Sequence, residues 1–138
     1  MFAQITILGT GLLGASIAMA ARSRAAARRV QVWSRRAETR AEAAETDWAD
    51  EVFDEPAAAC VGSDLIILCT PVDTIVPLLA RVADSIDGDA LITDVGSTKS
   101  RICREAAGVG RLGAQFLGSH PMAGSEQTGM AHARENLF

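Results

Sequence analysis

The sequence is poor in aromatic residues and contains no tyrosine. Phe and Trp make up 4% of its 138 residues, whereas 49% of the residues are hydrophobic. A chain of this length falls within the size range of one globular domain and can bury a core. The core must therefore consist mainly of aliphatic side chains and closely packed helices. This composition favours an α/β layered fold, with residues 1–138 as one domain.

Basic residues are not in excess either. Lys and Arg number 13 against 17 Asp and Glu, which gives a formal net charge of −4 at pH 7. Nucleic-acid-binding domains usually carry a concentrated basic surface, so we expect no nucleic-acid partner. Arginines do cluster between residues 22 and 40. By itself, that cluster is also compatible with a solvated helix end and loop.

Cysteines are few, and their spacing fits neither a disulfide framework nor a metal site. The three of them, Cys60, Cys69 and Cys103, are odd in number and form no C-x-x-C pair. We therefore expect a reducing, cytoplasmic location and no bound metal. Cys69 lies in an apolar run, where a free thiol usually serves as a small buried hydrophobic group.

Long apolar segments are also missing, so we expect no membrane partner. The first 21 residues are largely apolar and include an Ala-Met-Ala-Ala sequence that resembles a signal-peptidase site. However, no basic residue precedes this segment, and three glycines interrupt it. The segment is better explained as a strand and a helix of a soluble domain.

What the sequence does contain is an alternation of strand-forming and helix-forming segments. Apolar, β-favouring runs predict strands at residues 5–8, 30–33, 52–53, 65–69, 90–95 and 115–118. Helical patterns predict helices at residues 12–22, 37–46, 74–83 and 98–107, and the beginning of another at 131–138. This alternation predicts a doubly wound parallel sheet of the Rossmann type, in which ligands bind beyond the carboxyl ends of the strands.

A glycine-rich loop joins the first expected strand to the first helix. Residues 9–14 match the G-x-G-x-x-G pattern of dinucleotide-binding domains, although the pattern alone also occurs in turns that bind nothing. In the binding motif Gly9 permits a tight turn, Gly11 lets the pyrophosphate approach the backbone, and Gly14 allows close helix packing. The helix N-terminus then attracts the phosphates. We expect the whole loop to form the cofactor site: Gly9, Thr10, Gly11, Leu12, Leu13 and Gly14.

The end of the second strand indicates which dinucleotide is bound. Enzymes that use NAD usually carry an Asp or Glu there to accept hydrogen bonds from the ribose. This chain has Ser34, followed by Arg35 and Arg36. A serine hydroxyl can donate to a 2′-phosphate, and an arginine adds charge and paired hydrogen bonds. We therefore expect NADP(H), with NAD(H) as the alternative. The other interpretation of the two arginines is a solvated start to the next helix.

Three segments that follow the later strands carry a more specific signal. They are Cys-Thr-Pro-Val at 69–72, Asp-Val-Gly-Ser-Thr-Lys-Ser at 94–100 and Gly-Ser-His-Pro-Met-Ala-Gly-Ser-Glu at 118–126. With the glycine loop, Thr-Gly at 128–129 and Glu-Asn-Leu-Phe at 135–138, they resemble the prephenate and arogenate dehydrogenase family of tyrosine biosynthesis. The resemblance spans nearly the whole chain. It implies NAD(P)-dependent oxidative decarboxylation of prephenate or arogenate, a small-molecule substrate.

The resemblance also implies roles for individual residues. His120 matches the group that accepts the hydroxyl proton as hydride departs, a task that suits histidine because this side chain ordinarily titrates near neutral pH. Ser97 matches the serine that hydrogen-bonds this histidine and the substrate, but its position before the next helix also suits an N-cap. Ser125 and Glu126 match positions near the substrate, and Glu126 is equally compatible with a surface loop.

Four further residues complete the expectations. Thr70 and Pro71 follow the strand at 65–69 and, being just beyond a strand end, are expected to contact the cofactor. Lys99 and His132 are expected to face solvent.

Members of this family continue into a mainly helical domain that forms a homodimer and supplies an arginine for the substrate carboxylate. No residue here matches that arginine, so the resemblance implies that this chain is the cofactor-binding part, with a homodimer expected for the full-length member. Two alternatives stay open. One is a free-standing NADP-binding module without catalysis. The other is a dehydrogenase of the hydroxyacid or imine type, which shares the first half of the fold.

Overall fold

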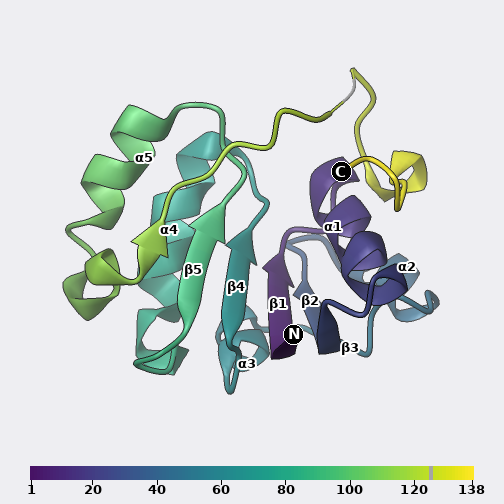
Figure 1. Cartoon of the computed structure of the whole chain (residues 1–138), viewed down its shortest axis with the longest axis horizontal. Coiled ribbons are helices and arrows are strands. Elements are labelled where there is room, and N and C mark those ends of the chain that lie inside the picture. Colours follow the sequence, from purple (N-terminus) through teal and green to yellow (C-terminus); the bar gives the residue numbers. More distant parts are fainter. Residues whose placement is uncertain (125) are drawn as a thin grey trace.

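The structure, a computed structural model, describes residues 1–124 and 126–138, and these residues form a central parallel sheet of six strands (Figure 1). The strands lie in the order β3-β2-β1-β4-β5-β6, and each neighbouring pair is parallel. Their bounds are Phe2–Leu8 (β1), Ala27–Trp33 (β2), Glu51–Phe53 (β3), Leu65–Leu68 (β4), Leu91–Asp94 (β5) and Phe116–Leu117 (β6). The strand order reverses at β1, so the carboxyl ends of β1, β2 and β4 are where such a sheet binds its ligand.

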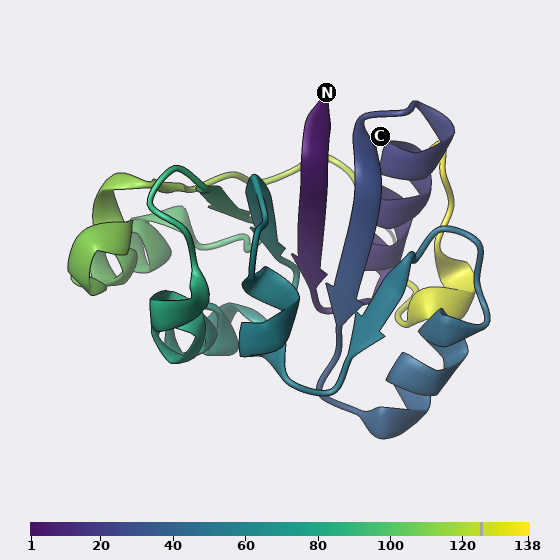
Figure 2. The same ribbon diagram turned by 90° about the horizontal axis from the view of Figure 1, so that it is seen from below.

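Helices pack against both faces of the sheet (Figures 1 and 2). Their bounds are Leu12–Ser23 (α1), Ala37–Ala44 (α2), Pro56–Cys60 (α3), Val72–Val82 (α4) and Lys99–Ala106 (α5). Short 3-10 helices lie at Ala83–Ser85, Gly110–Ala114 and Met130–His132. None of the helices in the described part of the chain is both long enough and apolar enough to span a membrane.

The core consists of two hydrophobic clusters, one on each face of the sheet. On β1, Ile5 and Ile7 belong to the cluster that includes α1 and α2, whereas Leu8 belongs to the cluster that includes α3, α4 and α5. The buried face of α1 is built largely from alanines; Ala15 and Ala18 are completely buried. These small side chains let α1 lie close to the sheet. The core is therefore largely aliphatic, as the composition indicates.

One half of the sheet keeps a face that no described helix covers. In Figure 1, α4 lies behind β4 and β5, and no helix is drawn in front of them. Two apolar residues on this face are exposed to solvent: Leu91 is 40% exposed and Leu117 is 63% exposed. The open face borders the loop that follows β6.

The predicted alternation of strands and helices is confirmed, with two departures. The prediction missed α3, because a helix of five residues is too short to show a helical period. The helix predicted to begin at 131–138 is wrong. That segment forms a single 3-10 turn at Met130–His132 and then leaves helical structure, because the Arg134 N–H donates to Ser16 Oγ of α1 at 2.9 Å instead of to a carbonyl of the preceding turn.

The last part of the chain connects the two halves of the sheet. After β6 it crosses above the carboxyl ends of the strands and reaches α1 (Figure 1). Met130 and Ala133 pack against the cluster around α1, and the fully buried Ser16 hydroxyl accepts the Arg134 N–H. Ser16 thus anchors the segment that follows the Gly-Ser-His-Pro loop.

Replacing Ser16 with Ala should loosen this segment without weakening α1. Ala forms helix better than Ser, whereas the Arg134 N–H loses its acceptor at a cost of about 1 kcal/mol. We expect the Arg134 amide to exchange about fivefold faster with deuterium, while amides of β1 exchange as before. Ser23→Ala, at the end of the same helix, is the matched control. Unchanged exchange at Arg134 in the Ser16 variant would show that packing alone holds the segment.

Candidate cofactor and active site

The glycine loop lies directly against the carboxyl end of β4. Gly9 has a φ of +108°, and a Cβ there would lie 2.8 Å from the carbonyl oxygen of Cys69, so conformation and space both require glycine. A Cβ on Gly14 would overlap the carbonyl oxygen of Gly9 and lie 3.2 Å from Cys69 Cβ. The close approach at Gly14 is therefore to the loop itself. A Cβ on Gly11, in contrast, would meet no heavy atom of the described part of the chain within 4 Å.

The first turn of α1 begins at this open space. Its N-cap is Gly11, which supplies no side-chain hydrogen bond, and the first turn contains no acidic residue. Backbone N–H groups at a helix N-terminus lack intrahelical acceptors and carry partial positive charge. This end of α1 is therefore suited to an anion such as a phosphate group.

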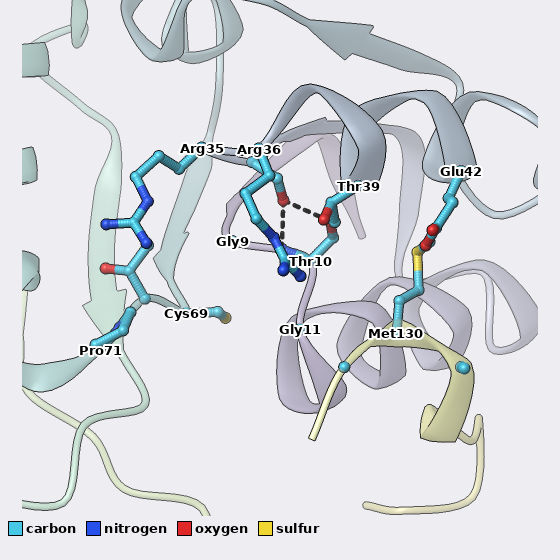
Figure 3. Close-up of a pocket in the computed structure, with 14 residues that line it drawn as sticks. Gly9, Thr10, Gly11, Arg35, Arg36, Thr39, Glu42, Cys69, Pro71 and Met130 are labelled. Carbon is cyan, nitrogen blue, oxygen red and sulfur yellow. Dashed lines mark hydrogen bonds between the residues drawn. The ribbon is translucent and has the colours of Figure 1, made fainter. Parts of the chain in front are cut away.

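A pocket of about 320 Å³ opens beside Gly11 (Figure 3). Most of the expected cofactor residues line it, namely Gly9, Thr10, Gly11, Ser34, Arg35, Arg36, Thr70 and Pro71. Leu12, Leu13 and Gly14 do not; they lie in α1, where Leu12 and Gly14 are buried. The structure thus brings together the ends of β1, β2 and β4 in one cavity.

The pocket also has walls that sequence reasoning missed. Thr39 and Glu42 of α2 line it, as do Cys69 and the segment 129–131. The spacing of Thr39 and Glu42 places them on one face of a helix, a signal that was available in the sequence. Nothing local in the sequence connects residues 129–131 to a loop near the N-terminus.

Ser34 is buried and joins β2 to the glycine loop. The Thr10 N–H donates to Ser34 Oγ at 2.9 Å, and the two side-chain hydroxyls lie 2.5 Å apart. Serine at this position therefore holds the loop in place besides bordering the pocket. When the Thr10 hydroxyl donates to Ser34, the Ser34 proton is available for an acceptor in the pocket.

Arg35 and Arg36 extend to different sides of the pocket. Arg35 runs along Pro71, whereas Arg36 points toward Thr10 (Figure 3). Among the described residues, neither guanidinium has a hydrogen-bond or ion-pair partner. Arg40 differs, because it donates to Asp54 Oδ1 at 3.0 Å and to two backbone oxygens of the turn after β2. Two unpaired positive charges therefore face the pocket.

A carboxylate lies on the opposite wall. Glu42 is exposed and reaches toward Met130, across the pocket from Arg35 (Figure 3). It makes the local charge less positive than the arginines alone would give.

The end of β4 adds a buried hydroxyl without a partner. Thr70 Oγ1 has no hydrogen-bond partner within residues 1–124 and 126–138, although it is buried. Such a group costs about 1–3 kcal/mol unless a ligand satisfies it. With the open space at Gly11 and the two unpaired arginines, Thr70 makes the pocket a good fit for a dinucleotide.

Cys69 lies beside Thr70 in the wall of the pocket. Burial raises the pKa of the Cys69 thiol, and the nearby Asp94 carboxylate raises it further. The thiol therefore stays protonated at neutral pH and is no nucleophile there.

His120 lies in a second pocket, of about 280 Å³, on the open face of the sheet. That pocket is mainly apolar, with Ile67 of β4, Val95 beyond β5 and Phe138 among its walls. Among the residues that the structure describes, the two pockets share no lining residue. The imidazole is exposed, so a substrate can reach it from solvent.

Ser97 follows β5 and is also exposed. Among the described residues no hydrogen bond joins it to His120. Its interpretation as a helix N-cap is wrong: α5 begins at Lys99, one residue later than expected, so Thr98 occupies the N-cap position and its side chain makes no capping bond.

The remaining expected site residues divide as follows. Glu126 is exposed, as a surface-loop residue would be, whereas Ser125 lies outside the described residues. His132 is exposed, as expected. The expectation that Lys99 faces solvent is wrong, because its ammonium group pairs with the buried carboxylate of Asp94.

Known proteins with the same features identify the family. The model of the prephenate dehydrogenase nucleotide-binding domain matches residues 17–138. Prephenate dehydrogenase of Bacillus subtilis (strain 168) is 36% identical over 135 residues, which are 97% of this chain and 36% of that protein. The crystal structure of Synechocystis arogenate dehydrogenase matches with a TM-score of 0.88 and 33% identity, over 98% of this chain and 46% of that one.

A second solved structure matches equally well. It is prephenate dehydrogenase from A. aeolicus in complex with hydroxyphenyl propionate and NAD+, with a TM-score of 0.90 and 25% identity. The match covers 99% of this chain and 48% of that one, so this chain spans less than half the length of these three relatives. The family model covers most of the chain and the structural match nearly all of it. The chain therefore belongs to the prephenate dehydrogenase family and corresponds to its nucleotide-binding domain.

Proposed function

We propose that the chain binds NADP(H) in the pocket beside Gly11 and is the cofactor-binding part of a prephenate or arogenate dehydrogenase. The observation that supports NADP(H) is a pair of arginines beside Ser34: Arg35 and Arg36 have no hydrogen-bond or ion-pair partner within residues 1–124 and 126–138. An NAD enzyme usually has a carboxylate at this strand end, and a carboxylate would repel a 2′-phosphate. The A. aeolicus relative was solved with NAD+, so the choice rests on this chain's own residues and not on its family.

The energetics favour the phosphorylated cofactor. A hydrogen bond between charged groups contributes about 1.5–3 kcal/mol, and a guanidinium can form two in parallel with a phosphate. Glu42 opposes this gain from across the pocket, but it reaches toward Met130, while Arg36 points toward Thr10, whose N–H donates to Ser34. Arg36 is thus the stronger candidate for the 2′-phosphate, and Arg35 extends along Pro71.

For the reaction we propose that His120 accepts the proton of the substrate's ring hydroxyl. When bound, a nicotinamide supplies the ring that takes up the hydride from the hydroxyl-bearing carbon. Loss of carbon dioxide then makes the substrate ring aromatic. Ser97 orients His120 and the substrate, and Ser125 and Glu126 contact the polar groups of the substrate. His120 is suited to its task by its exposure on the open face, next to the apolar pocket.

A second candidate is an NADP-binding module without catalysis. It is favoured by the separation of the two pockets, which share no lining residue, and by the absence of a hydrogen bond between Ser97 and His120 among the described residues. Reduction of NADP+ in the presence of prephenate or arogenate distinguishes the two candidates.

The cofactor choice is tested by calorimetric titration with both dinucleotides. We expect NADP+ to bind at least about tenfold more tightly than NAD+, which corresponds to about 1.4 kcal/mol. Arg36→Ala should weaken NADP+ binding about tenfold or more and leave NAD+ binding within about twofold. Arg28→Ala, an exposed arginine on β2 outside the pocket, is the control. Tighter binding of NAD+ than of NADP+ by the unchanged chain would overturn the proposal.

The proton acceptor is tested with His120→Asn. Because general-base catalysis contributes about 10²–10⁴ to a rate, we expect kcat to fall by that order with prephenate or arogenate, while the Kd of NADP+ stays the same. His132→Asn, an exposed histidine outside the second pocket, should change neither value. Retained turnover in the His120 variant would exclude it as the base, and cofactor binding without turnover in the unchanged protein would favour the non-catalytic module.

A further inference from the structure

The carboxylate of Asp94 is completely buried, and no step of the proposed reaction uses it. It is the last residue of β5, on the face of the sheet that packs against α4 and α5. A buried charge is costly unless it is both paired and hydrogen-bonded. Its partners are therefore informative, and they lie in the two loops that carry Ser97 and His120.

The first loop is held through Gly96, the residue before Ser97. The Gly96 N–H donates to Asp94 Oδ2 at 2.8 Å. A Cβ on Gly96 would lie 2.6 Å from Ile102 Cδ1 and 2.8 Å from Ile75 Cδ1. Only glycine therefore lets the loop pack this closely against these two side chains. The carboxylate thus draws the loop in between α4 and α5.

The second loop is held through Ser119, the residue before His120. The Ser119 N–H donates to Asp94 Oδ1 at 3.2 Å, and the Ser119 hydroxyl donates to the backbone oxygen of Asp94 at 2.6 Å. The Thr93 hydroxyl in turn donates to Ser119 Oγ at 3.0 Å. Asp94 Oδ2 therefore accepts a hydrogen bond from the first loop, and Oδ1 accepts one from the second.

Lys99 supplies the counter-charge. It is the first residue of α5, where a positive charge is unfavourable because the helix N-terminus is itself positive. Its ammonium group pairs with Asp94 Oδ2. The pairing neutralises the buried carboxylate and explains why a lysine stands at this end of a helix.

We propose that Asp94 is a positioning residue, which fixes His120 relative to Ser97 by holding the backbone of both loops, with Lys99 as its counter-ion. The proposal rests on the roles assigned to His120 and Ser97 above. The two residues share no direct hydrogen bond among the described residues, so their relative placement depends on the carboxylate that both loops bind. If Asp94 had a purely structural role, replacing it would lower the stability of the fold without a specific effect on the placement of His120.

The first test follows the two loops directly, without turnover. Asp94→Asn keeps the size of the side chain, but an NH₂ group replaces one carboxylate oxygen. That NH₂ group cannot accept the hydrogen bond that the oxygen accepted from a backbone N–H. We expect the Ser119 amide to exchange about tenfold faster or more and the ring signals of His120 to shift in the NMR spectrum of the NADP+-bound protein. Asp89→Asn, exposed just before β5, should leave both unchanged. Unchanged Ser119 exchange and His120 signals in the Asp94 variant would overturn the proposal.

The second test separates positioning from stability. In Asp94→Asn combined with Lys99→Met, both charges are gone, so stability should recover relative to the single variant. The placement of His120 should not recover. We expect kcat to stay lower by a factor of about 10–100, with the KM for NADP+ within about twofold of the unchanged protein. Recovery of kcat together with stability would show that Asp94 acts through stability alone. Absence of turnover in the unchanged protein would count against the proposed function, and the exchange measurement would still decide the role of Asp94.

Discussion

The contact of the glycine loop with the end of β4 is the constraint on which the rest of the site depends. A side chain on Gly9 would collide with the backbone of Cys69, and a side chain on Gly14 would collide with the backbone of the loop itself. This close approach puts the first turn of α1 at the point where the strand order reverses. It also brings Thr10 within hydrogen-bond distance of Ser34, which couples the loop to the end of β2. A side chain at either glycine would move all three elements.

Distant parts of the chain complete both halves of the site. Residues 129–131 form one wall of the pocket beside Gly11, and the buried Ser16 hydroxyl helps to hold this segment against α1. The loops after β5 and β6 are joined by the buried Asp94 carboxylate. Each of these segments is therefore held by a specific polar contact, either with Ser16 of α1 or with Asp94 at the end of β5.

Much of this arrangement could be predicted from the sequence, because parallel strands buried on both faces form continuous apolar runs such as the one at β4. The glycine loop and the position of Ser34 were visible because each follows a β-favouring run, at residues 5–8 and 30–33, in which one polar residue, Thr6 or Gln31, stands among apolar ones. The partner of Lys99 could not be predicted, because its contact with Asp94 depends on how the Gly96 loop folds inward. Met130 and the 3-10 turn escaped prediction because their contacts are made with α1, far away in the sequence. The helix α3 was too short to produce a periodic signal.

The central claim is that the pocket beside Gly11 holds a dinucleotide whose 2′-phosphate meets the turn after β2. NMR titration of the ¹⁵N-labelled chain with NADP+ and with NAD+ tests this most directly. The account predicts that both ligands shift the amides of Gly11, Thr70 and Met130, and that the difference between the two ligands is concentrated at residues 34–36. Identical shifts at residues 34–36 with both ligands, or shifts that avoid Gly11, would contradict it.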